Sequence, residues 1–183
     1  MNSFVTLATA INDQPHPNIV LEPALVAFAM LHAKRDNHGV WAFSLTSGSA
    51  STFDEEIDAM SLLADTLPWP MVLIGRSPET KIYQPLMHVV DLAPAPLKCH
   101  FAGRIARAFG GPIVDLDAGR SAKPRPTGGR EPDVLRDVLR CEVLDDWLEF
   151  LRGAGGKNTD AAKAATGAWL IKVAGELPAY SRS

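Results

Sequence analysis

Residues 52–75, TFDEEIDAMSLLADTLPWPMVLIG, join a helix to a buried strand and decide the class of the fold. Thr52 and Glu55 have the spacing of a capping box, in which each side chain bonds a backbone N–H of the other residue. Apolar residues then recur at helical spacing, and Pro68 ends the helix because it has no N–H to donate. The apolar run over residues 71–75 is typical of a strand in a parallel sheet. This stretch therefore predicts a helix over 54–67 that leads into a central strand.

The chain before this helix has the character of β-structure. The apolar segments 4–10, 24–31 and 40–45 each have the length of a strand. The polar connection over residues 34–39 favours antiparallel pairing of the last two. We therefore expect the first three strands to form an antiparallel meander.

Helices dominate the chain after residue 75. The sequence predicts helices over 79–90 (bent or broken at Pro85) and 97–109, a short strand over 112–116, and helices over about 134–152 and 159–177. This order predicts a single α/β domain over residues 1–183, with a mixed β-sheet flanked by helices.

Composition excludes several classes of protein. The chain has 183 residues, of which 46% are hydrophobic and 21% charged, and its net charge is −3. These values fit one folded domain and argue against a protein that coats nucleic acid through bulk charge. No apolar run reaches the roughly 18 residues that span a bilayer, so we expect no membrane partner. Two cysteines and no basic segment before the first apolar run favour a cytoplasmic protein.

Three segments carry a resemblance to a known family. Residues 4–10, FVTLATA, form the opening strand and contain no charged side chain. Residues 71–77, MVLIGRS, are followed at residues 83–86 by YQPL, and residues 141–152 read CEVLDDWLEFLR. Together they resemble the three motifs of DEDD-type 3′-5′ exonucleases, in the polymerase-B-like branch of the ribonuclease H-like superfamily.

The resemblance implies a degenerate catalytic centre. In that family the first strand supplies an Asp-x-Glu pair that holds two metal ions, and here that strand has no carboxylate. Tyr83-Gln84 stands in place of the second motif's Phe-Asp. Cys141 occupies the slot of the third motif's Tyr or His, relative to Asp145. The resemblance therefore implies a ribonuclease H-like fold over roughly residues 3–155, with Asp145 as a catalytic remnant that faces one cleft with residues 7–10 and Gln84.

The remaining carboxylates leave an alternative open. Hydrolysis by two metal ions needs several carboxylates around ions about 4 Å apart. Asp115 and Asp117 would share one face of an extended strand, so Asp115, Asp117 and Asp145 form a candidate metal site. Mg²⁺ or Mn²⁺ would then be the cofactor, although the leading expectation is that none is bound. On the helix, Asp145 lies beside the apolar stripe, and Asp146 is expected on the solvent side.

A basic segment is the candidate nucleic-acid site. Residues 119–133 are rich in Gly, Pro and cations and predict a mobile loop, which could track the phosphates of DNA or RNA or serve only as a solvated linker. The candidate binding residues are Arg76, Arg120, Lys123, Arg125 and Arg130.

Three functions therefore stay open. The leading interpretation is a catalytically degenerate exonuclease-like domain that binds nucleic acid or a protein assembly. The second is an active metal-dependent 3′-5′ exonuclease with displaced carboxylates. The third is a protein-interaction or regulatory module in which the basic loop has no role.

Overall fold

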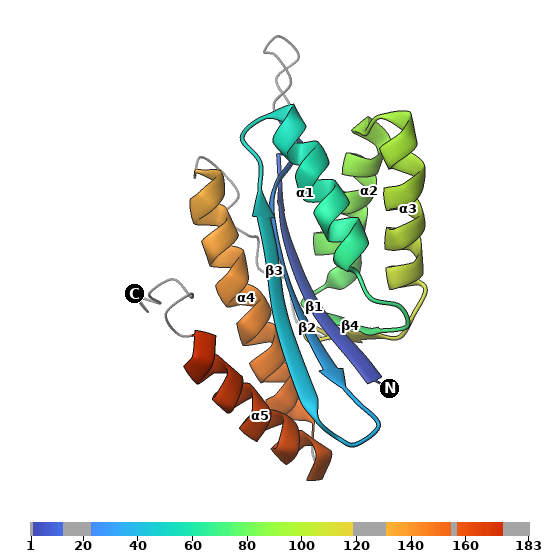
Figure 1. The fold of residues 1–183 in the computed structure, drawn as a ribbon. Helices are drawn as coiled ribbons and strands as arrows, with labels where there is room; N and C mark the ends of the chain where they lie inside the picture. The colour runs from blue at the N-terminus through green and yellow to red at the C-terminus, as the bar shows by residue number, and fades with distance from the viewer. Residues whose placement is uncertain (1, 13–22, 119–130, 155–156, 174–183) are drawn as a thin grey trace.

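A computed structural model of the chain describes residues 2–12, 23–118, 131–154 and 157–173. A five-stranded mixed sheet lies between two layers of helices (Figure 1), which confirms the predicted α/β class. The strands are β1 (Asn2–Ile11), β2 (Leu25–Arg35), β3 (Trp41–Ser49), β4 (Val72–Gly75) and β5 (Ile113–Asp115). The helices are α1 (Phe53–Thr66), α2 (Gln84–Leu92), α3 (Ala95–Phe109), α4 (Pro132–Gly153) and α5 (Lys157–Val173), with a π-helical turn, η1 (Glu79–Tyr83), directly before α2.

The first three strands form the predicted antiparallel meander. β2 pairs antiparallel with both β1 and β3. The turn between β2 and β3 is closed by Asp36, whose carboxylate accepts from the backbone N–H groups of His38 at 2.8 Å and Val40 at 2.9 Å. Gly39 adopts a φ of +85°, which glycine tolerates better than residues with a side chain. The β2–β3 ladder runs from Ala27–Ser49 to Arg35–Trp41, so both strands end several residues beyond their apolar runs.

The second half of the sheet is parallel. β4 pairs parallel with β1, and β5 pairs parallel with β4, so the strand order is β3-β2-β1-β4-β5. α1 makes the crossover to β4 and begins with the predicted capping box. The Thr52 hydroxyl accepts from the Glu55 N–H at 3.3 Å, and the Glu55 carboxylate accepts from the Thr52 N–H at 3.2 Å. The predicted break near Pro85 is also found, because η1 gives way to α2 at Gln84.

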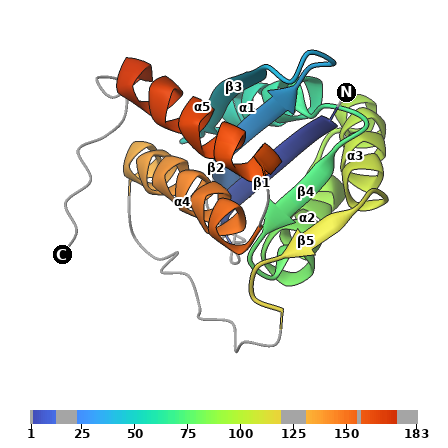
Figure 2. The same cartoon turned by 90° about the horizontal axis from the view of Figure 1, so that it is seen from below.

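The two faces of the sheet are covered by different helices (Figure 2). One core contains Leu7 and Phe28 from the sheet and is covered by α1, α2 and α3. The other contains Ala8 and Leu31 and is covered by α4 and α5. Trp147 of α4 is buried in this second core, and its indole N–H donates to the Thr166 hydroxyl of α5 at 3.0 Å. Small alanines on this face of β1 and β2 leave room for the tryptophan.

Candidate functional site

β1 supplies hydroxyl groups where the family resemblance led us to look for carboxylates. Thr6 is 1% exposed, and its hydroxyl donates to the Val143 carbonyl of α4 at 2.8 Å. The Thr9 hydroxyl donates to the Lys81 carbonyl of η1 at 3.4 Å. These bonds tie the central strand to the helical segments on its two sides. Both side chains therefore have structural roles, and neither carries the negative charge that a divalent cation requires.

The prediction that residues 7–10 face one cleft is wrong. Successive side chains of a strand point to opposite faces, so Leu7 joins the core under α1 and Ala8 joins the core under α4. Gln84 is exposed at the start of α2. Only alternate side chains of residues 7–10 can therefore face α4.

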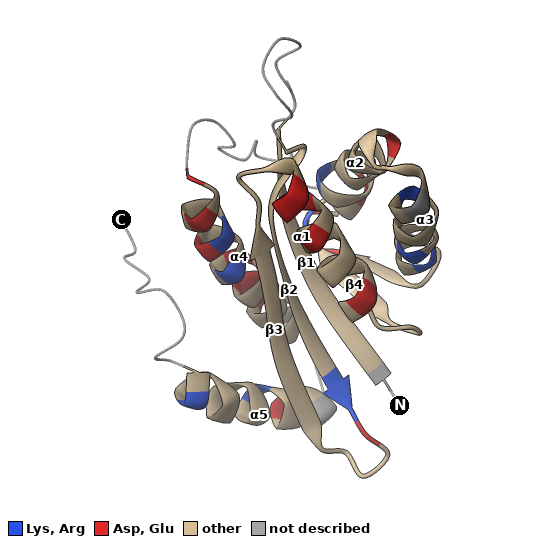
Figure 3. Cartoon of the chain, turned by 45° about the horizontal axis from the view of Figure 1, so that its top comes forward, with Lys and Arg blue, Asp and Glu red and all other residues tan. Residues whose placement is uncertain are grey.

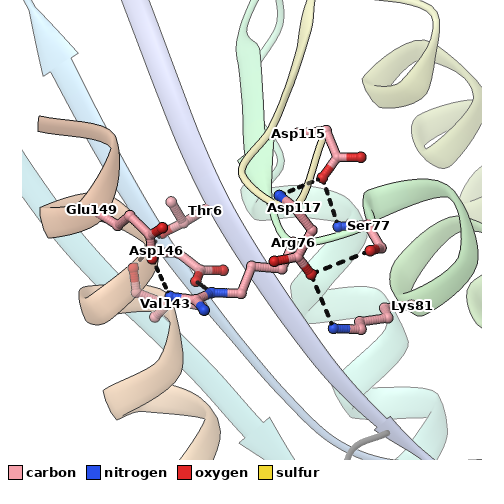
Figure 4. Close-up of polar contacts among 9 residues, drawn as sticks. All are labelled: Thr6, Arg76, Ser77, Lys81, Asp115, Asp117, Val143, Asp146 and Glu149. Atoms are coloured by element: carbon pink, nitrogen blue, oxygen red, sulfur yellow. Dashed lines mark hydrogen bonds and ion pairs between the residues drawn. The ribbon is translucent and has the colours of Figure 1, made fainter. Parts of the chain in front are cut away.

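Arg76 forms the charged centre of the described site (Figure 4). It follows β4 directly and reaches across to α4. Its Nε donates to Oδ1 of Asp146 at 2.7 Å, and its Nη2 donates to the Glu149 carboxylate. The hydrogen bond to Asp146 raises the pKa of the guanidinium above its ordinary value. Burial opposes this rise, and the charges of Asp146, Glu149 and Asp117 add to it. Arg76 is therefore a permanent internal cation that joins β4 to α4.

α4 turns Asp146, and not Asp145, toward the sheet. Asp146 is 1% exposed, whereas Asp145 is exposed. The sequence had suggested the reverse, with an apolar stripe formed by Leu144, Trp147, Leu148 and Leu151 and Asp146 on the solvent side. In the structure the buried face is centred on Val143 and Trp147, and Leu148 is only half-buried. This small rotation brings Asp146 inward, where Arg76 supplies the cation that a buried carboxylate needs.

A second polar group surrounds Ser77, on the other side of Arg76 (Figure 4). Ser77 has a φ of +48°, a rare conformation for a residue with a side chain. Its N–H donates to Oδ1 of Asp115 at 2.8 Å, and its hydroxyl donates to Oδ2 of Asp117 at 3.3 Å. The Lys81 ammonium lies 3.4 Å from the same Asp117 oxygen. These contacts hold the end of β4 against the end of β5.

Asp115 and Asp117 do not share a strand face. β5 ends at Asp115, and the Asp117 N–H turns back to donate to Oδ1 of Asp115 at 2.9 Å. The chain therefore bends where an extended strand was expected. Within the described residues there is no group of three or more Asp, Glu, His or Cys side chains placed to hold a metal ion.

The whole site has an excess of negative charge. Two cations, Arg76 and Lys81, face four carboxylates, so the formal sum is 2 − 4 = −2. The carboxylates are those of Asp115, Asp117, Asp146 and Glu149. The arrangement can bind charged or polar groups through its remaining lone pairs, but each cation is already committed to a carboxylate.

Several candidates from the sequence lie elsewhere. Cys141 is half-buried, and burial together with the Asp145 charge raises the pKa of its thiol, which makes it a poor nucleophile. Arg120, Lys123, Arg125 and Arg130 lie outside the described residues. No helix in the described part of the chain is long and apolar enough to cross a membrane.

Sequence reasoning missed four members of the site. Ser77, Lys81, Asp146 and Glu149 were not selected, although Arg76 was. A cation directly after a buried strand signals that an acidic partner lies nearby, but its partners are 70 and 73 residues away along the chain. Comparison of the chain with protein-family models, with curated proteins and with solved structures gives no match.

Proposed function

We propose that this protein is a ribonuclease H-like domain that has lost phosphodiester hydrolysis and acts by binding nucleic acid or a protein assembly. The strand order supports the fold assignment: three antiparallel strands are followed by two parallel strands, and β1 lies at the centre. The position of α4 agrees with it, because this helix follows β5 and packs against β1 through the Thr6–Val143 bond.

The single observation that carries the proposal is the ion pair of Arg76 with Asp146 and Glu149. A catalytic centre of this superfamily would use acids of the last helix as metal ligands. Here the Arg76 guanidinium is already paired with both Asp146 and Glu149. With Arg76 in place the formal charge of this group is 1 − 2 = −1 instead of −2, so it attracts a dication less strongly than the two carboxylates alone would. The internal cation thus takes the electrostatic role of a metal ion without its ability to activate water.

The first strand supports the same conclusion. Its inward polar groups are the Thr6 and Thr9 hydroxyls, which are engaged with backbone carbonyls. Neutral hydroxyls are weak ligands for Mg²⁺, which favours carboxylate and water oxygens. The first strand consequently lacks the carboxylates that two-metal catalysis would need from it.

Metal titration and a nuclease assay test the loss of catalysis. We expect no saturable binding of Mg²⁺ or Mn²⁺ below millimolar concentration by calorimetry, and no metal-dependent degradation of single-stranded DNA or RNA. Asp146→Asn and Asp145→Asn are a matched pair, since they change a buried and an exposed acid on the same helix. Sub-millimolar metal binding and hydrolysis that are lost in Asp146→Asn but kept in Asp145→Asn would overturn the proposal.

A binding assay tests the other half of the proposal. Fluorescence anisotropy with labelled single-stranded DNA and RNA at low salt measures nucleic-acid binding directly. Saturable binding without hydrolysis supports a nucleic-acid-binding domain. No binding at any salt concentration rejects nucleic acid as the partner and leaves a protein assembly.

A further inference from the structure

The outer face of α1 has acidic residues in its first two turns and in its last turn (Figure 3). The helix contains five acids and no Lys, Arg or His. Glu56 is buried, and the other four acids are exposed. The exposed acids are Asp54, Glu55, Asp58 and Asp65.

The neighbouring helix α3 has the opposite charge (Figure 3). It contains Lys98, Arg104 and Arg107, together with His100, and has no acid. Neither Arg104 nor Arg107 makes an ion pair with another described residue. The three positions 100, 104 and 107 follow helical spacing, so they lie on one side of α3. Beside them the outward ridge consists of the small exposed residues Cys99, Gly103 and Ala106, which would allow another element to approach closely.

Exposed apolar side chains accompany these charges. Leu62 of α1 is 41% exposed and Trp69 is 53% exposed. Trp69 follows the end of α1, and its ring lies beside Gly111, just beyond the end of α3. It therefore lies where the C-terminal ends of the two helices meet. Tryptophan is among the residues that most often dominate the binding energy of protein interfaces.

α1 and α3 form one continuous surface. His100 Nε2 of α3 is 3.2 Å from Asp65 Oδ1 of α1, and both side chains are about half exposed or more. We propose that this α1/α3 face docks against the same face of a second copy of the chain. In the two-fold dimer, the acidic α1 of each copy lies against the basic α3 of the other.

Charge selects a second copy over a polyanion. A nucleic acid on α3 would also lie beside the acids of α1, which repel phosphate. A two-fold axis that runs between α1 and α3, parallel to both helices, instead places the α1 of each copy opposite the α3 of the other. The contact between unlike charges then occurs twice, because an isologous interface repeats each contact. The proposal is independent of the Arg76 site, because that site lies against α4 on the other face of the sheet.

The size of the surface predicts a weak dimer. α1 has 14 residues and α3 has 15, so both helices are about 21–23 Å long at a rise of about 1.5 Å per residue. Two helices side by side, each about 10 Å wide, give a patch of roughly 20 Å by 20 Å. Such a patch belongs at the low end of specific interfaces. We therefore expect a dissociation constant in the micromolar range.

Charge reversal with complementation tests the dimer by sedimentation velocity at low salt. The full chain should dimerise at concentrations of about 10–100 µM, as micromolar affinity implies. Asp58→Lys/Asp65→Lys should be monomeric there, and so should Arg104→Glu/Arg107→Glu. An equimolar mixture of these two variants should form a heterodimer, because both α1–α3 contacts then join unlike charges again. The matched control, Asp160→Lys/Lys163→Glu, reverses two exposed charges on α5 and should dimerise like the unmodified chain.

Three results would overturn the proposal. The first is a full chain that stays monomeric at about 100 µM, a concentration well above a micromolar dissociation constant. The second is dimerisation of either reversed variant alone. The third is a mixture of folded reversed variants that forms no heterodimer. Thermal unfolding followed by circular dichroism establishes that each variant is folded, and Trp69→Ser, which alters no charge, should weaken the dimer at least tenfold. Loss of oligonucleotide binding in Arg104→Glu/Arg107→Glu, with a monomeric full chain, would assign the surface to nucleic acid instead.

Discussion

Replacement of Arg76 by Met measures how strongly the internal cation stabilises the fold. Met retains much of the apolar stem and removes the charge, so Asp146 keeps its position without the guanidinium. Loss of one partner of a buried ion pair costs about 3–5 kcal/mol. Because Arg76 is 35% exposed, water can enter the vacated space, and we expect a loss near the lower limit, about 3 kcal/mol. In a domain of this size that loss lowers Tm by roughly 6–12 °C.

A double-mutant cycle isolates the ion pair. Removal of both charges in Arg76→Met/Asp146→Leu should recover most of the lost stability, because a buried pair and an apolar pair of similar volume are often equally stable. Urea unfolding of both single variants and the double variant gives the coupling energy, which we expect to be about 2–3 kcal/mol.

Arg136→Met is the matched control. Arg136 lies on α4 and is 32% exposed, close to the value for Arg76, but its partner Asp133 is 73% exposed. Arg136 also pairs with Asp137, which is 38% exposed, and exposed pairs of this kind contribute at most about 1 kcal/mol each. A loss below about 1 kcal/mol for Arg76→Met, or a double variant as unstable as Arg76→Met alone, would refute the argument that Asp146 depends on Arg76.

Three further predictions concern titration, reactivity and charge. Burial raises the pKa of Glu56, although its hydrogen bond from the Leu25 N–H opposes the shift. The folded state therefore binds the Glu56 proton more tightly than the unfolded state, so the unmodified chain loses stability as pH rises from 4.5 to 7 and this carboxyl ionises. The Glu56→Gln variant does not have this loss, so its stability relative to the unmodified chain should rise over the same range. A difference in urea unfolding that does not change with pH would contradict this. Cys99 is exposed and should react with iodoacetamide faster than Cys141, whose thiol has a raised pKa; equal rates by mass spectrometry would mean that Cys141 is accessible as a thiolate. If the segment 119–130 binds DNA or RNA, replacement of its four cations by Ala should reduce the slope of log affinity against log salt by up to roughly 3, while an unchanged slope would exclude it.

Local signals were sufficient to predict most of the elements. The capping box at Thr52 and the stop at Pro68 define α1 through contacts within a few residues, and the structure reproduces both ends to within one residue. The sequence also predicted the presence of the first three strands and the break of the helix near Pro85. These features depend on backbone chemistry over short distances, so they do not require knowledge of the remaining fold.

The candidate site was only partly predictable. Arg76 was selected only as a cation that could accompany the basic segment 119–133, and Asp115 and Asp117 were selected from their place beside a strand. The bend at Asp117 could not be foreseen, because it depends on the Ser77 N–H and hydroxyl, which reach the two aspartates from a different strand.

The sequence by itself determined which segments become helices and strands, since helical period, capping and proline act locally. Only the tertiary structure decided which acid of α4 became buried. The apolar stripe is too broad to define the rotation of the helix to within one residue. The bond from Thr6 to the Val143 carbonyl and the burial of Trp147 set that rotation, and Asp146 then meets Arg76 across a separation of 70 residues. Packing between distant segments therefore chose Asp146 over Asp145, because a buried carboxylate is tolerated only where a cation is brought to it.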